Sequence, residues 1–299
     1  MSIGEPRSGE YEPELVRVPS RLYAGYVFDL DGTIYLGSQL LPGAARLVQA
    51  LREMDRKVMF VSNNPTRDPD EYERKLWAMG LRASSSEIVN TVLTTTRWLA
   101  ANAPDAVVFP ISEEPLKRAL RDCGIRTSED PAEIDIVIAS YDRHFEYRKL
   151  QIAFDAIWRH RRARLVATNP DRFCPVADGG GEPDAAAITA AIEACTGARC
   201  ELHFGKPGEV MLNAIVETLE LAPGDCVLTG DRVATDIRAA REASMASALV
   251  LTGETRPDEV PRIPEENRPD YVLDRIDRLI PRDYWDELGW NLEAGNERM

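Results

Sequence analysis

The stretch YVFDLDGT at residues 26–33 decides the fold. Three apolar residues run directly into Asp29, although a carboxylate is a poor strand former and is costly to bury. A strand that ends in this way is typical of an open parallel sheet, in which ligands bind at the carboxyl ends of the strands. The alternative is that Asp29 is an ordinary loop or capping residue.

A helix and a second strand follow this stretch. Pro42 opens a segment whose apolar residues recur at helical spacing, and the apolar run KVMFV at residues 57–61 then ends at Ser62. The helical stripe consists of Leu47, Val48, Leu51 and Met54. This succession of strand, helix and strand predicts a βαβ unit in a parallel sheet.

The same alternation continues to the C-terminal region. Residues 200–204, 226–229 and 248–251 have strand patterns and are separated by helical stripes. Between about residues 83 and 199, further strand patterns at 106–109, 134–139 and 165–168 alternate with helix patterns at 116–121, 147–159 and 185–194. We therefore predict an α/β protein, with a Rossmann-like doubly wound parallel sheet as its core and an inserted α/β domain.

The expected boundaries follow from these patterns. Residues 21–82 and 200–281 form the core, and residues 83–199 form the inserted domain. Residues 1–20 are expected to be a flexible N-terminal extension, and residues 282–299 a C-terminal tail.

Composition narrows the class of protein. The chain has 299 residues, and 36 basic against 50 acidic residues give a net charge of −14, which argues against a nucleic-acid binder or a protein of anionic membrane surfaces. We find no apolar run of the roughly 18 residues that a membrane span needs, and no signal-peptide pattern. The five cysteines are odd in number and form no CxxC pair, so we expect no disulfide framework or zinc site and a cytoplasmic location.

Polar clusters follow five of the apolar strand patterns and are expected at one edge of the sheet. They are Asp29 with Asp31, Ser62 to Asn64, Lys206, Asp231, and Thr252 with Gly253. Asp29 and Asp31 point the same way along an extended chain. Three carboxylates around one point repel each other unless a cation neutralises them, so Asp29, Asp31 and Asp231 imply a divalent cation, with Mg²⁺ favoured.

Lys206 and Ser62 supply the complementary chemistry. An ammonium and a hydroxyl suit a phosphate that bridges to Mg²⁺, although Lys206 taken alone would be read as a surface lysine. Asp236 lies five residues after Asp231. It has two interpretations: it orients the metal site, or it caps a helix and is purely structural.

These residues carry a family resemblance. DLDGT at 29–33, SNN at 62–64, GKP at 205–207 and GDRVATD at 230–236 resemble the four ordered motifs of the haloacid dehalogenase superfamily. The first two motifs are 33 positions apart and leave no room for a cap domain, whereas the 144 positions from Ser62 to Lys206 accommodate an α/β cap. This placement, with TNPD at 168–171 and AAIEACTG at 190–197, resembles subfamily IIA, the NagD and para-nitrophenyl phosphatase group.

The resemblance implies a role for each motif residue. Asp29 would attack phosphorus, and Asp31 would protonate the leaving oxygen and then activate water. Mg²⁺ would be held by Asp29, Asp231 and the backbone carbonyl of Asp31. Ser62 and Lys206 would bind the transferring phosphoryl group.

The remaining motif residues have supporting roles in this interpretation. Asn63 would bind beside the phosphate and orient the nucleophile region, and Asp236, Thr33 and Asn64 would orient the groups that touch metal or phosphate. Asn169, Asp171 and Arg143 are expected as cap contacts to the substrate, although Arg143 could instead pair with a surface acid. The glycine-rich loop at 176–184 is expected to face the leaving group.

The leading function is therefore a Mg²⁺-dependent phosphatase of small phosphomonoesters, such as sugar phosphates, glycerol phosphate or para-nitrophenyl phosphate. Pyridoxal phosphate and nucleoside monophosphates are alternative substrates. A phosphomutase is disfavoured because the mutases of this superfamily carry their cap between the first two motifs. A phosphoacceptor or phosphate-binding module is the alternative from another class. The expected partner is a small phosphorylated metabolite, and the resemblance is also compatible with a homodimer formed through the cap.

Overall fold

A computed structural model of the chain describes residues 15–175 and 180–290. The chain forms two compact units. Among the described residues, the first unit contains those up to 60, residues 79–81 and those from 219 onward, and the second contains those of 61–78 and 82–218. The predicted N-terminal extension, the C-terminal tail and the glycine-rich loop lie partly outside the described residues.

A parallel sheet forms the centre of the first unit. Its strands lie in the order β13-β12-β11-β1-β4, and β4 continues into the second unit, where β5 lies next to it. The strands are β1 (Gly25–Asp29), β4 (Lys57–Ser62), β5 (Ile88–Asn90), β11 (Cys226–Gly230), β12 (Ala246–Val250) and β13 (Tyr271–Leu273). From β1 the chain adds β4 and β5 on one side of the sheet and then β11, β12 and β13 on the other. The carboxyl end of β1 is therefore the point where the strand order reverses.

Short elements surround this sheet. The strands β2 (Tyr35–Leu36) and β3 (Gln39–Leu40) form a hairpin directly after β1, and helix α1 (Ala44–Glu53) follows it with its apolar face buried. A π-helical turn, Val233–Ile237, leads from β11 into helix α8 (Arg238–Glu242). The 3-10 turns of this unit are Pro223–Asp225, Pro257–Arg262, Glu265–Asn267, Ile276–Leu279 and Arg282–Tyr284.

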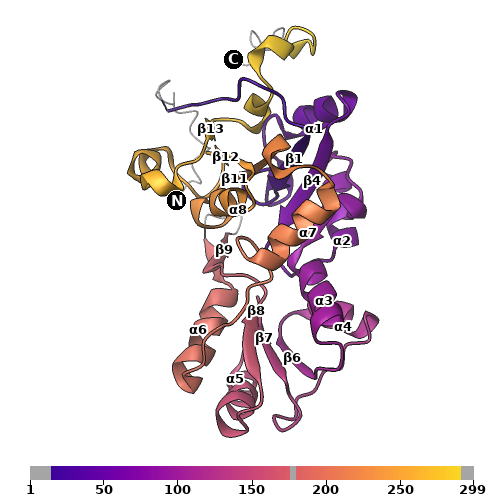
Figure 1. Ribbon diagram of the computed structural model, residues 1–299, viewed down its shortest axis with the longest axis vertical. Coiled ribbons are helices and arrows are strands. Elements are labelled where there is room, and N and C mark those ends of the chain that lie inside the picture. The colour runs from indigo at the N-terminus through magenta and orange to yellow at the C-terminus, as the bar shows by residue number, and fades with distance from the viewer. Residues whose placement is uncertain (1–14, 176–179, 291–299) are drawn as a thin grey trace. The chain divides into compact units, whose positions relative to one another are not determined.

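The second unit has a three-stranded parallel sheet with helices on both faces (Figure 1). The strands β6 (Val108–Ile111), β7 (Ile136–Ala139) and β8 (Arg164–Ala167) alternate their side chains between the two faces. Helices α3 (Thr91–Asn102) and α4 (Glu114–Asp122) cover one face and α5 (Tyr147–Phe154) and α6 (Ala185–Thr196) the other. Each strand is thus apolar on both sides, as a buried parallel sheet requires.

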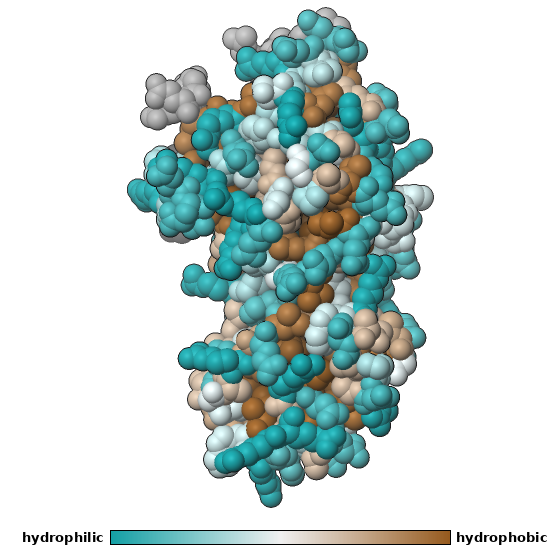
Figure 2. All heavy atoms as spheres, in the orientation of Figure 1, coloured by the Kyte–Doolittle hydropathy of each residue, from teal (hydrophilic) through white to brown (hydrophobic). Residues whose placement is uncertain are grey.

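Two helices and a hairpin remain in the second unit. They are α2 (Pro69–Ala78), α7 (Glu209–Leu219) and the antiparallel hairpin of β9 (Phe173–Pro175) with β10 (Gly181–Pro183). A 3-10 turn, Ser85–Glu87, and a π-helical turn, Asp155–Arg159, also belong to this unit. Charged and polar residues cover most of the face of the molecule that Figure 2 shows. No helix in the described ranges combines the length and the apolar character needed to cross a membrane.

The predicted fold class is confirmed, and most of the predicted elements are present. One strand prediction was wrong. Residues 200–204 form no strand, and only His203 makes an isolated bridge, to Ala167. The pattern there was too short and too polar to distinguish a strand from an extended loop.

Candidate active site

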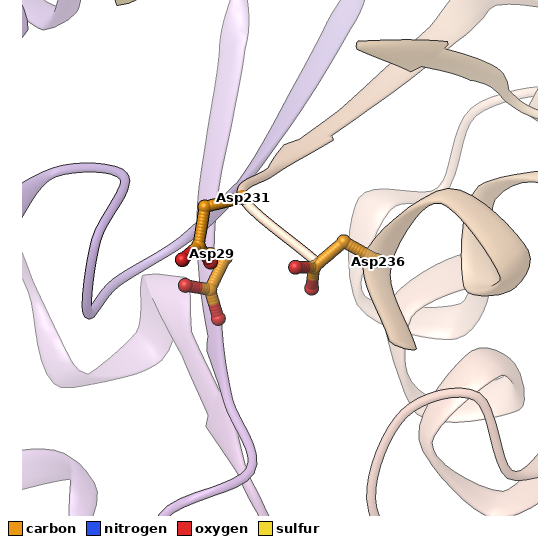
Figure 3. Close-up of side chains that lie close together, drawn as sticks. All are labelled: Asp29, Asp231 and Asp236. Carbon is orange, nitrogen blue, oxygen red and sulfur yellow. The ribbon is translucent and has the colours of Figure 1, made fainter. Parts of the chain in front are cut away.

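Three carboxylates gather at the carboxyl ends of β1 and β11. Asp29 is the last residue of β1, and Asp231 directly follows β11, whose Thr229 pairs with Phe28 in register. Asp236 comes from the π-helical turn. One carboxylate oxygen from each of the three lies within 4.8 Å of the others, and Figure 3 shows the three groups facing one another.

The turn after Asp31 shapes this cluster. Gly32 has φ of +85°, and its N–H donates to the Tyr35 carbonyl at 2.8 Å. A Cβ at this position would lie 2.5 Å from Asp231 Oδ2, so both the backbone conformation and the close approach require glycine. The Asp231 carboxylate therefore packs against the backbone of Gly32, in space that the side chain of any other residue at position 32 would occupy.

Asp31 lies beside the cluster but is held differently. Its carboxylate accepts a hydrogen bond from the Tyr35 hydroxyl at 2.9 Å, and it is not among the grouped carboxylates of the described residues. The predicted contact of its backbone carbonyl with a metal stays a prediction. The Thr33 hydroxyl is fully buried and makes no hydrogen bond within residues 15–175 and 180–290.

The Ser62–Asn64 segment forms a compact polar turn in the second unit. Ser62 is buried, and its hydroxyl shares a hydrogen bond with the Tyr72 hydroxyl at 3.1 Å and accepts one from the Asn64 N–H at 3.2 Å. The Asn64 side chain accepts from the Thr66 N–H at 2.9 Å and contacts Cys174 Sγ at 3.5 Å. These bonds fix the orientation of the Ser62 hydroxyl.

Asn63 connects this turn to the segment that carries Lys206. Its Nδ2 donates to the Lys206 carbonyl at 3.0 Å, and its Oδ1 accepts from the Lys206 N–H at 2.7 Å. The Lys206 side chain is almost completely buried. A positive charge held in one place suits the binding of an anion such as a phosphate.

Asn169 and Asp171 join the same network. Asn63 Nδ2 also donates to Asp171 Oδ2 at 2.9 Å, and Asn169 Nδ2 donates to the Asn63 carbonyl at 3.0 Å. Both side chains are buried, with exposed fractions of 0% for Asn169 and 7% for Asp171. In the structure, Asn169 and Asp171 therefore hydrogen-bond to Asn63. Their predicted contacts with a substrate stay a prediction.

Arg143 is paired with an acid of its own unit. Its guanidinium donates two hydrogen bonds to Glu113, at 2.6 and 2.7 Å, and lies over the Tyr141 ring. This pair lowers the pKa of Glu113, chiefly through the side-chain hydrogen bond from Arg143. Tyr141 in turn donates to Glu182 on β10, and burial raises its pKa. The observed contact of Arg143 is therefore a pairing with an acidic residue, which was the alternative to a substrate contact.

Comparison with known proteins places the chain in a family. Models described as haloacid dehalogenase-like hydrolase and HAD-hydrolase-like match residues 26–126 and 203–279. Sugar-phosphatase AraL of Bacillus subtilis is 34% identical over 253 residues, which cover 85% of this chain and 90% of that protein. The chain belongs to the haloacid dehalogenase-like hydrolases.

Solved structures agree with this assignment. The p-nitrophenyl phosphatase from Archaeoglobus fulgidus superposes with a TM-score of 0.79 at 31% identity and covers 87% of this chain and 98% of that one. A glycerol phosphate phosphatase from Mycobacterium tuberculosis in complex with magnesium gives a TM-score of 0.78 at 26% identity, with 89% and 79% covered. This haloacid dehalogenase-like hydrolase is an enzyme of the phosphomonoester-hydrolysing, NagD-like type.

The residues of this hydrolase fit a hard divalent cation. The grouped ligand atoms of Asp29, Asp231 and Asp236 are all carboxylate oxygens, which Mg²⁺ prefers, and Asp231 and Asp236 are buried. Gly32 keeps the space beside Asp231 clear of a Cβ. Carboxylates this close to one another repel, and a bound divalent cation would offset that repulsion.

Sequence reasoning missed two features of this site. Asp236 was expected only to orient the metal ligands or to cap a helix, yet its carboxylate lies in the cluster itself. Tyr35 was not considered, although it holds Asp31. A tyrosine four positions after an acid in a tight turn could have signalled this contact, whereas a π-helical turn has no recognisable sequence pattern.

Proposed function

We propose that this enzyme hydrolyses small phosphomonoesters in a Mg²⁺-dependent reaction, with Asp29 as the nucleophile. The observation that carries the proposal is the convergence of Asp29, Asp231 and Asp236 at the ends of adjacent strands. Bound Mg²⁺ would neutralise charge on the phosphoryl group and on these carboxylates. Asp29, Asp231 and the Asp31 carbonyl would hold it, with Asp236 beside them.

The chain's own residues then account for the chemistry. An Asp29 oxygen bonds to phosphorus as the ester oxygen leaves with a proton from Asp31. Asp31 next takes a proton from water, whose oxygen attacks phosphorus and releases Asp29 and inorganic phosphate. The hydrogen bond from the Tyr35 hydroxyl orients the Asp31 carboxylate for both transfers.

Ser62 and Lys206 would bind the phosphoryl oxygens. The Asn63 side chain holds the backbone of Lys206, and the Tyr72 hydroxyl holds the Ser62 hydroxyl. These contacts would preorganise both residues before the substrate binds. Preorganisation matters because donors that need no rearrangement stabilise the developing charge at no reorganisation cost.

The substrate class is supported by the relatives. Sugar phosphates come first, because the Bacillus subtilis relative is named a sugar-phosphatase, and glycerol phosphate and para-nitrophenyl phosphate follow from the solved structures. The test is phosphate release from a panel that also contains pyridoxal phosphate and nucleoside monophosphates, with Mg²⁺ or EDTA. We expect release only with Mg²⁺, and equal release in EDTA would contradict the proposal.

A further inference from the structure

The segment Thr252–Thr255 follows strand β12 in the first unit and has no part in the proposed chemistry. Its sequence is TGET, and its first two residues, Thr252 and Gly253, are one of the polar clusters expected at the strand ends. It lies against the two segments that carry Asp31 and Asp231. We call it the 252–255 loop.

The loop holds Asp231 through three hydrogen bonds. The Glu254 N–H donates to Asp231 Oδ2 at 2.6 Å, which fixes one oxygen of the carboxylate. Thr255 donates to the Asp231 carbonyl twice, from its hydroxyl at 2.6 Å and from its N–H at 3.2 Å. One loop therefore fixes both the backbone and the side chain of Asp231.

Gly253 brings the loop backbone against the same carboxylate. A Cβ at this position would overlap Asp231 Oδ2 and contact Asp231 Cγ at 2.5 Å. Because these are atoms of a buried aspartate on a neighbouring strand end, any larger residue at 253 must displace the carboxylate or the loop.

The loop also holds the turn that follows Asp31. The Thr252 hydroxyl donates to the Gly32 carbonyl at 2.7 Å. The side chain of Glu254 in turn pairs with Arg232 at 2.8 Å, which ties the loop to the residue after Asp231. Both segments that would hold the cation are thus joined through residues 252–255.

We propose that the 252–255 loop is a positioning element for the divalent cation, acting through Asp231 and the Asp31–Gly32 turn. This inference rests on the proposed function. A loop that only stabilised the fold would alter unfolding but leave the Mg²⁺ affinity of the folded protein unchanged. A positioning loop makes that affinity depend on its hydroxyls and on Gly253.

The test is calorimetric titration of the full chain with Mg²⁺ alone, for Thr252→Val, Thr255→Val and Gly253→Ala. Each valine substitution removes one hydroxyl hydrogen bond with little change in side-chain shape. We expect the Mg²⁺ dissociation constant of each valine variant to rise roughly three- to tenfold over that of the wild type. Thr252→Ser and Thr255→Ser retain the hydroxyl and should recover most of the affinity. Gly253→Ala should weaken binding further.

Two matched controls belong to the same unit. Thr229→Val alters a buried hydroxyl that makes no hydrogen bond within the described residues, and Gly224→Ala adds a Cβ that meets nothing within 4 Å. Both should bind Mg²⁺ like the wild type. Should Gly253→Ala fail to fold, the two valine variants decide the question.

The outcomes separate this inference from the proposed function. Wild-type protein that binds no Mg²⁺ would overturn both. In the other case the wild type binds Mg²⁺, and folded variants of Thr252, Gly253 and Thr255 bind it with the same affinity. This result would overturn only the role of the loop.

Discussion

The side-chain amide of Asn63 and the backbone of Lys206 exchange two hydrogen bonds across 143 positions of sequence. The amide donates to the Lys206 carbonyl and accepts from its N–H, as a neighbouring strand would. The same Nδ2 group reaches Asp171. Since Ser62 precedes Asn63, this pair connects the two residues that we propose bind the phosphoryl group.

Asn63→Asp should therefore destabilise the protein strongly. The new carboxylate would face the Asp171 carboxylate and the Lys206 carbonyl, where the amide donated to both. We expect a loss of about 1 to 3 kcal/mol in the free energy of unfolding, because a partly buried carboxylate would be left opposite two acceptors. Urea denaturation measures this loss.

Asn102→Ala is the matched control. That amide donates to the Trp98 carbonyl on an exposed part of the same unit, so its removal should cost less than about 1 kcal/mol. If Asn63→Asp lowered the free energy of unfolding no more than this control does, the hydrogen bonds of Asn63 would not contribute measurably to stability.

The Asn63 network marks the limit of what the sequence could predict. Strand-end placement was sufficient to bring Asp29 and Asp231 together, because adjacent parallel strands end at one edge. It could not show that Asn169 and Asp171 turn inward to Asn63, since these contacts depend on how loops from separate strands meet. Buried amides rarely have a local sequence pattern.

His203 should give the stability of the protein a pH dependence. Burial lowers its pKa below the ordinary value of 6.5, so the unfolded chain binds a proton that the folded chain does not. The contribution of His203 to stability is therefore fully present above pH 6.5 and is lost as the pH falls through its lowered pKa. His203→Gln should flatten this part of the curve.

The measurement is urea denaturation of wild type and His203→Gln across the acid range. The difference between the two curves isolates His203 from the carboxylates, which titrate in both proteins. His160→Gln replaces an exposed histidine of the same unit and serves as the control. Parallel curves for His203→Gln and the wild type would contradict this assignment.

The cysteines should differ sharply in reactivity. Burial raises the pKa of Cys200 to about 11 and also raises that of Cys226, so both stay as thiols at neutral pH. Cys123 and Cys195 are exposed. Alkylation followed by peptide mapping should label the exposed pair first, Cys200 more slowly, and the buried Cys226 only on unfolding. Labelling of Cys200 as fast as Cys123 would contradict its raised pKa.

Arg143→Ala tests the predicted substrate contact in the second unit. The arginine is half-exposed and paired with Glu113, so we expect a cost in stability of less than about 1 kcal/mol. If Arg143 binds substrate, KM should rise roughly tenfold with kcat nearly unchanged, which is the pattern of lost uniform binding. Arg148→Ala, which breaks an exposed pair with Glu129, is the control. An unchanged KM would remove Arg143 from substrate binding.

The acidic cluster itself was predicted only in part. The DLDGT and GDRVATD motifs carry Asp29 and Asp231, whose carboxylate oxygens lie within 4.8 Å of each other. The position of Asp236 depends on a π-helical turn, Val233–Ile237, which shifts side chains relative to an α-helix and cannot be read from periodicity. The contact of Asp31 with Tyr35 likewise depends on the hairpin that follows.

Trapping the phosphoryl group on the protein tests the central claim most directly. The enzyme is quenched in acid during turnover with Mg²⁺, and the site of phosphorylation is located by peptide mass mapping. We predict one phosphoryl group on Asp29, absent from an Asp29→Asn variant that is folded but inactive. Phosphorylation at another residue, or turnover by Asp29→Asn at the wild-type rate, would contradict the account.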